Sequence, residues 1–403
     1  RGPDGPVAST RTNLIRLPTE TAELELLPVG IILSVASADG LTVAEASNLL
    51  ANHPTVPVSV LLGDGVLAQL YDDPALAEMF QQAVNDRPVL ARPELRLDPS
   101  ALAEIGQQAL YQDALNSTRA AMTELGLSPT ETLLPVDLAL TTEGAQMLLE
   151  LGIDQVVDIC ASSQPGGTIT TPDGRLHVIR IDDDLTSEFA ARSRAESRAH
   201  HLLARLAVRY ETDRAPIVLG GPAMAKAEVN SLEILLSAVD QLGLLEAVGL
   251  DTAASGQLPI RPAESPAQDL SDLSAEISQT LDTIDTYESF HLTGGVSPEE
   301  IRAELLAALS RDLNPENRAR ATAAVAASME SALGVVTLAE TESVTVAARR
   351  STIPLTIDNS ASGPRSVLLR FQTDKVDVVQ DGAVLEIPAG TSQLDIEVET
   401  RSL

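Results

Sequence analysis

The stretch LLPVGIILSV (residues 26–35) decides the fold, because it is the first of seven short apolar runs that each precede a helical pattern. The other six runs are Pro57–Gly63, Arg87–Pro93, Thr132–Leu138, Gln155–Ile159, Pro216–Gly220 and Ala247–Asp251. Strands that alternate with helices in this way form a parallel sheet. We therefore predict a mixed α/β domain over residues 21–258, after a flexible lead-in over residues 1–20. Its seven strands are expected to close into a (β/α) barrel.

One segment interrupts this alternation. Thr168–Thr171 and Leu176–Ile181 flank the turn sequence Pro172-Asp-Gly174, which predicts a β-hairpin. Because the hairpin follows the fifth apolar run, we expect it to be an insertion that covers or decorates the mouth of the barrel.

The last third of the chain changes pattern twice. A Pro-rich break opens a helical segment, residues 259–338, with helices expected at about 270–290, 298–312 and 315–333. Residues 339–403 alternate with period two, which predicts an immunoglobulin-like β-sandwich. The chain ends directly after the last strand, so we expect this sandwich to be truncated. The six expected strands are Val344–Ala347, Ile353–Ile357, Val367–Phe371, Val376–Val379, Ala383–Ile387 and Leu394–Val398.

Composition excludes several classes of function. The formal net charge of −31, from 27 basic and 58 acidic residues, repels nucleic acids and anionic membranes, so neither is an expected partner. The single cysteine, Cys160, excludes an intrachain disulfide. The chain has no Trp, four Tyr and four Phe, and none of them falls at a predicted end of a barrel strand. Sugar sites favour aromatic walls, so this scarcity weighs against a glycan-cleaving barrel.

Catalytic groups in such barrels lie just past the carboxyl ends of the strands. A pair of carboxylates there is the machinery of glycoside hydrolysis, but an Asp before a helix is also a common N-cap. Both interpretations stay open for each residue. The candidate catalytic residues are Asp137, Asp251 and Glu94, and the candidate binding residues are Arg92, Asp39, Asp64 and Asp158.

Metal and cofactor sites have no local signature. The five histidines show no His-x3–5-His spacing, so we predict no metal site. Phosphate-binding glycine motifs are absent, so we predict no nucleotide cofactor. The run Asp182-Asp-Asp184 precedes a helix and is interpreted as an N-terminal cap in preference to a cation site.

The stretch from Leu134-Pro-Val-Asp137 through the helix Thr141–Gly152 to Val156-Val157 resembles polysaccharide deacetylases of the glycoside hydrolase/deacetylase superfamily. That resemblance implies a seven-stranded βα barrel. The chain departs from the deacetylase pattern after the first strand, where the enzymes have Asp-Asp and this chain has Ala38-Asp39. Their metal-binding His pair also has no counterpart after Arg92-Pro-Glu94.

A longer resemblance is to the actinobacterial cell-envelope family DUF6049. It is carried by Ala199-His-His-Leu-Leu-Ala-Arg-Leu-Ala207, by Ala215-Pro-Ile-Val-Leu-Gly-Gly-Pro222, and by the tail from Ile353-Pro-Leu-Thr-Ile-Asp-Asn359 to Ile387-Pro-Ala-Gly-Thr391, besides residues 134–159. The resemblance implies an extracytoplasmic protein that a segment outside this chain anchors in the membrane. It implies as partner a cell-envelope membrane protein, with the lipid II flippase of peptidoglycan synthesis as the candidate.

Two functions are therefore expected from the sequence. The favoured one is a non-catalytic interaction domain in peptidoglycan assembly, because the strand ends carry few catalytic residue types. The alternative is a carboxylate-dependent glycan hydrolase or deacetylase-like enzyme that acts on cell-wall polysaccharide.

Overall fold

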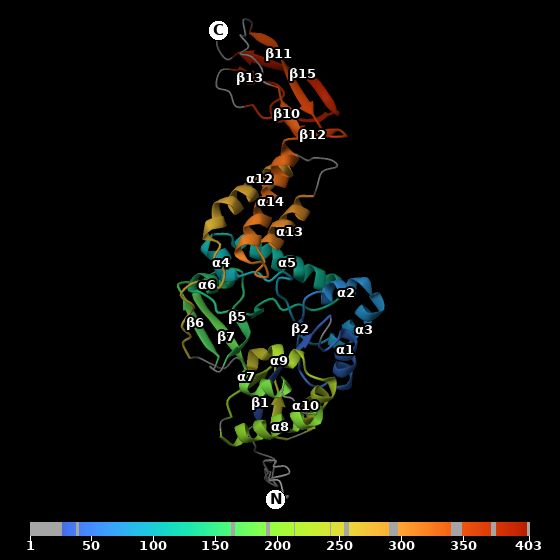
Figure 1. The fold of residues 1–403 in the computed structure, drawn as a ribbon, viewed down its shortest axis with the longest axis vertical. Coiled ribbons are helices and arrows are strands. Elements are labelled where there is room, and N and C mark those ends of the chain that lie inside the picture. The colour runs from blue at the N-terminus through green and yellow to red at the C-terminus, as the bar shows by residue number, and fades with distance from the viewer. Residues whose placement is uncertain are drawn as a thin grey trace, which may run out of the picture. The chain divides into compact units, whose positions relative to one another are not determined.

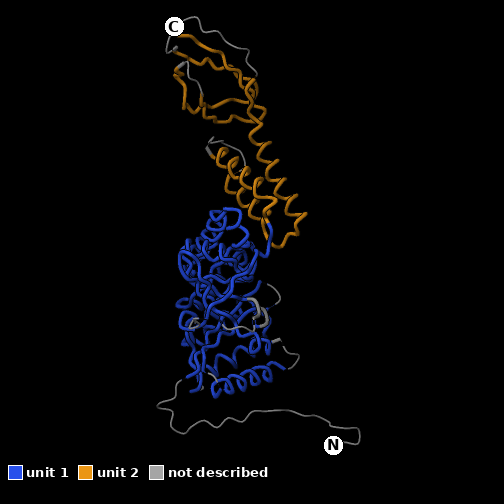
Figure 2. The backbone as a smooth tube through the Cα atoms, turned by 90° about the vertical axis from the view of Figure 1, so that its left-hand side faces the viewer, with its two compact units in different colours: residues 1–269 blue, residues 270–403 orange. Residues whose placement is uncertain are grey.

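The computed structural model describes residues 26–37, 40–162, 166–190, 194–212, 214–241, 243–253, 258–289, 297–339, 349–371 and 376–400. The chain forms two compact units, residues 1–269 and residues 270–403 (Figure 2). Unit 1 alternates strands with helices, whereas unit 2 begins with helices and continues with strands (Figure 1).

Unit 1 is a mixed α/β fold with parallel strands, as the sequence predicts. Its strands are β1 (Leu27–Val35), β2 (Ser59–Leu62), β3 (Val89–Leu90), β4 (Leu133–Val136), β5 (Gln155–Ser162), β6 (Gly167–Thr171), β7 (Gly174–Asp182), β8 (Ile217–Leu219) and β9 (Leu245–Ala247). Its α-helices are α1 (Val43–Asn52), α2 (Val66–Asp72), α3 (Pro74–Val84), α4 (Pro99–Glu104), α5 (Gln108–Glu124), α6 (Thr142–Glu150), α7 (Asp183–Thr186), α8 (Ala195–Thr212), α9 (Gly221–Ala225), α10 (Val229–Gln241) and α11 (Leu250–Ala253).

The strands form two sheets with the orders β3-β2-β1-β8 and β4-β5-β7-β6, and β9 pairs with the beginning of β1. A parallel bridge between Val89 and Pro129 links the segment before β4 to β3. One hydrophobic cluster receives side chains from β1, β2, β3, β4, β5, β7 and β8, and it holds the interior of the unit together. Its members include Ile32, Leu61, Leu90, Leu133, Val157, Ile179 and Val218.

The hairpin prediction is confirmed in its strands, because β6 and β7 pair antiparallel, but the predicted role of β7 is wrong. Strand β7 pairs parallel with β5, and its Ile179 and Ile181 join the central cluster. Strand β7 is therefore an internal strand of the sheet β4-β5-β7-β6 and not part of an insertion at the mouth of the expected barrel. Its nine residues are long enough to pair with β5 on one edge and with β6 on the other.

The seventh predicted strand, Ala247–Asp251, also differs in the structure. Strand β9 ends at Ala247, and the next residues form the short helix α11. Leu250 and Ala253 lie three positions apart and both enter the central cluster, which is the spacing of one helical face.

Unit 2 contains the three predicted helices, α12 (Ser274–Ser289), α13 (Pro298–Ala308) and α14 (Pro315–Leu333). Its strands form the antiparallel sheet β10-β11-β15-β13 and the hairpin-like pair β12-β14. These strands are β10 (Val336–Leu338), β11 (Arg350–Asn359), β12 (Arg365–Leu368), β13 (Val376–Val378), β14 (Val384–Ile387) and β15 (Gly390–Thr400). The predicted strand Val344–Ala347 lies outside the described residues, and β10 falls where the sequence predicted only the helical segment.

Residues from both sheets of unit 2 share one apolar cluster, with Ile357 and Ile396 from the larger sheet and Val367 and Ile387 from the smaller. Buried Asn359 fixes the turn at one end, since its Nδ2 donates to the carbonyl oxygens of Ile387 at 2.9 Å and Gly363 at 3.0 Å. The two sheets therefore pack face to face.

Candidate functional site

The carboxyl ends of β2, β3 and β4 bring together four of the residues that the sequence singled out. Asp64 follows β2, Arg92 and Glu94 follow β3, and Asp137 follows β4. Arg92 lines two small neighbouring pockets, one beside Asp64 and Glu94 and the other beside Asp137. We call these four residues, together with Arg96, the strand-end rim.

The first pair of the rim joins Asp64 to Arg92. Arg92 Nη2 donates to Asp64 Oδ1 at 2.7 Å, and the Asp64 side chain is two-thirds exposed. Glu94 is exposed beside this pair, and its backbone N–H donates to Thr118 Oγ1 on α5 at 3.2 Å. The shared pocket has a volume of about 20 Å³, room for about one water molecule.

The second pair of the rim joins Asp137 to Arg96. Arg96 donates from Nε at 3.1 Å and from Nη2 at 2.6 Å, and both hydrogen bonds end on Asp137 Oδ2. The Asp137 side chain is 21% exposed and that of Arg96 is 38% exposed. Two charge-assisted hydrogen bonds to one oxygen fix the carboxylate in place.

Tyr111 lies on helix α5 and not at a strand end, but its buried ring lines the same pocket as Asp137, so an aromatic residue does stand beside this candidate carboxylate. Burial raises the pKa of the Tyr111 hydroxyl, and the negative charges of Asp137 and Asp98 add to that rise. The ring reaches the site from a helix, so its position in the sequence does not reveal it. The pocket has a volume of about 30 Å³.

The remaining candidates do not join the rim. Asp158 follows cluster residue Val157 in β5 and therefore points to the opposite face of the sheet, where Arg180 Nε lies 3.4 Å from its Oδ2. Asp251 is exposed on α11, a helix whose Leu250 packs against Gly30 in the first half of β1. It lines neither of the two pockets of the rim. Asp39 lies outside the described residues.

Sequence reasoning missed Arg96 as a site residue. Asp98 is the N-cap of α4, because its Oδ1 accepts from the backbone N–H groups of Ser100 and Ala101, and its Oδ2 also accepts from the backbone N–H of Gln268. Asp98 thereby holds the segment before residue 270 on unit 1. The sequence signal that could have identified Arg96 is its place four residues after the candidate Arg92, in the segment Arg92-Pro-Glu-Leu-Arg96.

Asp182 of the acidic run and two of the histidines have structural partners. Asp182 caps α7 through the N–H of Leu185 at 3.0 Å, as predicted for that run. His201 pairs with Glu188, and His53 pairs with Glu233. Within the described residues, no three His, Cys, Asp or Glu side chains gather as a metal site would require. No helix in those residues combines the length and apolarity needed to cross a membrane.

Comparison with solved structures supports the fold. The 4-alpha-glucanotransferase from Thermococcus litoralis is similar over 88% of this chain and 64% of its own, with 11% identity and a TM-score of 0.50. An alpha-mannosidase from Enterococcus faecalis matches 93% of this chain and 56% of its own, at 11% identity and a TM-score of 0.49. The chain thus spans less than two-thirds of the length of either protein.

A putative polysaccharide deacetylase from Mycobacterium smegmatis matches 63% of this chain and 100% of its own, at 10% identity and a TM-score of 0.42. No family model and no curated protein matches the sequence. At 11% identity and a TM-score of 0.50, the likeness to the glucanotransferase concerns the fold alone.

Proposed function

We propose that this chain is a non-catalytic interaction domain of a membrane-anchored cell-envelope protein. The observation that carries the proposal is the ion pairing at the strand-end rim. Asp137, a candidate catalytic carboxylate, is held by Arg96, and the candidate binding residue Asp64 is held by Arg92, so both are engaged in structural pairs. The pockets beside them are about 20–30 Å³, far below the several hundred Å³ of a typical ligand site.

The proposal also concerns how the strands of each unit are arranged. We propose that seven parallel strands of unit 1 (β1, β2, β3, β4, β5, β7 and β8) close into a barrel, supported by the single cluster to which these seven contribute. We also propose that the strands of unit 2 are an immunoglobulin-like sandwich, supported by the two sheets that share one apolar cluster.

The proposed partner is a membrane protein of cell-wall assembly, with the lipid II flippase as the candidate and cell-wall glycan as a second ligand class. This assignment, with the extracytoplasmic location, rests on the resemblance to DUF6049. The exposed acids Glu94 and Asp64 make the rim the expected contact surface, because surface charges guide association and fix its specificity.

The test is co-purification of the anchored full-length protein with the flippase from detergent-solubilised membranes. Glu94→Lys should reduce recovery of the flippase about tenfold, the scale of one misplaced interfacial charge. Glu211→Lys makes the same charge change at an exposed position of α8 and should leave recovery unchanged. Equal recovery with both variants would remove the rim from the proposal, and no recovery with the unaltered protein would remove the partner.

A glycan hydrolase is the second candidate, and one observation favours it. Asp137, Arg96 and Tyr111 line one pocket, and Arg92 joins it to the pocket of Glu94. Asp251, the other catalytic candidate, lines neither pocket, so Glu94 would be the second carboxylate. Release of soluble fragments from peptidoglycan by the purified chain, lost in Asp137→Asn, would overturn the non-catalytic assignment.

A further inference from the structure

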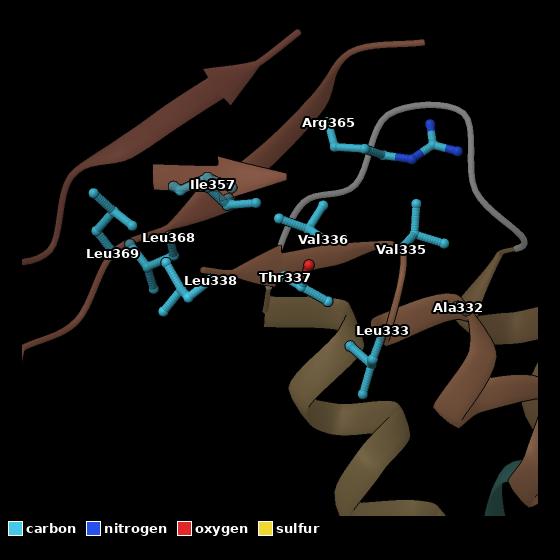
Figure 3. Close-up of a pocket in the computed structure, with 11 residues that line it drawn as sticks. Ala332, Leu333, Val335, Val336, Thr337, Leu338, Ile357, Arg365, Leu368 and Leu369 are labelled. Atoms are coloured by element: carbon cyan, nitrogen blue, oxygen red, sulfur yellow. The ribbon is translucent and has the colours of Figure 1, made fainter. Parts of the chain in front are cut away.

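A pocket in unit 2 has a different character from the strand-end rim. It lies where the end of α14 and strand β10 meet β11 and β12, and its volume is about 200 Å³. Its walls are mainly aliphatic, with Leu333, Val336, Leu338, Ile357 and Leu369 among them (Figure 3). For comparison, a dry apolar cavity of about 150 Å³ inside a protein holds one benzene molecule.

One end of this pocket is apolar and exposed to solvent. Leu338 is 60% exposed, and it pairs in register with the lining residue Ile357. A ligand's apolar group that covered Leu338 would remove its side chain from water, which is favourable. Ile357, Val367 and Leu369 continue the same wall into the buried cluster between the sheets, so the pocket is an opening into that core.

The pocket has one cationic lining residue. Arg365 belongs to β12, and its guanidinium points toward the side of Val335 and away from Leu368 and Leu369 (Figure 3). A guanidinium carries five N–H donors, so it binds a ligand anion while keeping a contact within the protein. The pocket therefore has a leucine-lined end and a cationic end.

We propose that this pocket binds a single aliphatic chain of about eight carbons with an anionic head group, the chain between the leucines and the head group on Arg365. The net charge of −31 does not oppose such a ligand at short range, because salt screens distant charges over about 8 Å. The inference is independent of the strand-end rim, since none of the rim residues lines this pocket.

The pocket makes a quantitative prediction for a series of fatty acids from butanoate to dodecanoate. Each methylene buried contributes about 0.8 kcal/mol, so affinity should rise about fourfold per carbon and level off near octanoate. Binding to the full chain is measured by titration calorimetry. A series that stays flat, or an absence of binding by any member, would overturn the proposal.

Two matched pairs of variants locate the site. Arg365→Gln should weaken octanoate about tenfold, the effect of one charge-assisted hydrogen bond, and leave octanol binding unchanged, whereas Arg370→Gln, at an exposed arginine outside the pocket, should change neither. Leu338→Asp should abolish octanoate binding, whereas Val379→Asp, at a residue 69% exposed and outside the pocket, should not. Octanoate binding that survives both Arg365→Gln and Leu338→Asp would contradict the assignment.

A third arm separates the two sources of such a chain. Octanoate binding without co-sedimentation with phosphatidylglycerol vesicles indicates a free amphiphile. Co-sedimentation with these vesicles that Leu338→Asp abolishes indicates an acyl chain presented by a lipid. Either result supports the pocket, and co-sedimentation unaffected by Leu338→Asp, without octanoate binding, would contradict it.

Discussion

Unit 1 and unit 2 differ in how completely they fill their interiors. In unit 1, the pockets at the strand-end rim have volumes of about 20–30 Å³, and Arg92 and Arg96 form ion pairs with the carboxylates of Asp64 and Asp137 there. In unit 2, a pocket of about 200 Å³ opens between aliphatic walls. The strand-end rim of unit 1 thus offers less room for a ligand than the pocket of unit 2, which shows why function is argued from a site and not from a fold.

The largest effect on stability should come from removing the buried carboxylate of Asp98 in unit 1. Asp98 is 1% exposed and accepts from three backbone N–H groups, two in α4 and one at Gln268. Asp98→Ala should lower the free energy of unfolding by about 3 kcal/mol, since it removes an N-cap and leaves buried donors without an acceptor.

Urea unfolding followed by circular dichroism measures the effect, and Glu104→Ala, at an exposed position of the same helix, is the control. If the two units unfold in separate transitions, only one should move. A loss below about 1 kcal/mol would mean that other groups replace Asp98 as acceptor.

The same substitution should have opposite effects in the two units. Ala101 in α4 is fully buried, so Ala101→Leu should destabilise unit 1 by about 1–3 kcal/mol through overpacking. Ala332 lines the open pocket of unit 2, so Ala332→Leu should stabilise that unit by about 0.5–1 kcal/mol. Thermal unfolding of both variants checks the signs, and a loss of stability in both would refute the contrast in packing.

Local patterns predicted the elements well and their long-range partners poorly. The apolar runs located β1, β2, β4 and β5, and helical spacing located α12, α13 and α14. The role of β7 was missed because a local sequence pattern does not show which strand a given strand pairs with, and β7 pairs with β5. The predicted strand through Asp251 failed because the apolar run there continues as one turn of helix.

The candidate site shows the same limit. The four rim residues that sequence reasoning identified all lie at or just after the ends of predicted strands, so topology alone brings them together. Arg96 was missed because its partner Asp137 lies 41 residues away, a separation across which the sequence shows no periodicity. Tyr111 was missed because it reaches the pocket of Asp137 from α5. Whether a strand-end Asp acts as an acid or as an ion-pair partner depends on such distant groups.

A smaller effect is expected from the ion pair of the rim. Arg96→Met should cost about 1 kcal/mol, because Asp137 loses two charge-assisted hydrogen bonds in a partly buried place. Arg320→Met removes a pair with Glu316 whose side chains are 71% and 83% exposed, and should cost less than about 0.5 kcal/mol. Chemical denaturation compares the two variants. Equal costs would mean that the rim pair is no stronger than a surface pair, and its structural role would be weakened.

The smallest effect should appear only as a dependence on pH in unit 1. Glu188 Oε2 lies 2.8 Å from His201 Nδ1, and its Oε1 accepts from Arg205 at 2.8 Å. Burial raises the pKa of Glu188, but the hydrogen bonds from His201 and Arg205 outweigh burial, so the pKa lies below its ordinary value of 4.5. A carboxyl whose pKa is depressed by folding stabilises the fold above its ordinary pKa, and this stabilisation is lost as pH falls through the folded value.

Glu188→Gln should therefore lower the Tm by about 1–2 °C at pH 6–7, and the difference from the unaltered protein should shrink as pH falls below about 4.5. Glu211→Gln, at an exposed position of α8, is the control variant for the same change of residue. A difference that grows toward acid pH would reverse the sign of the linkage and show that the folded protein favours protonated Glu188.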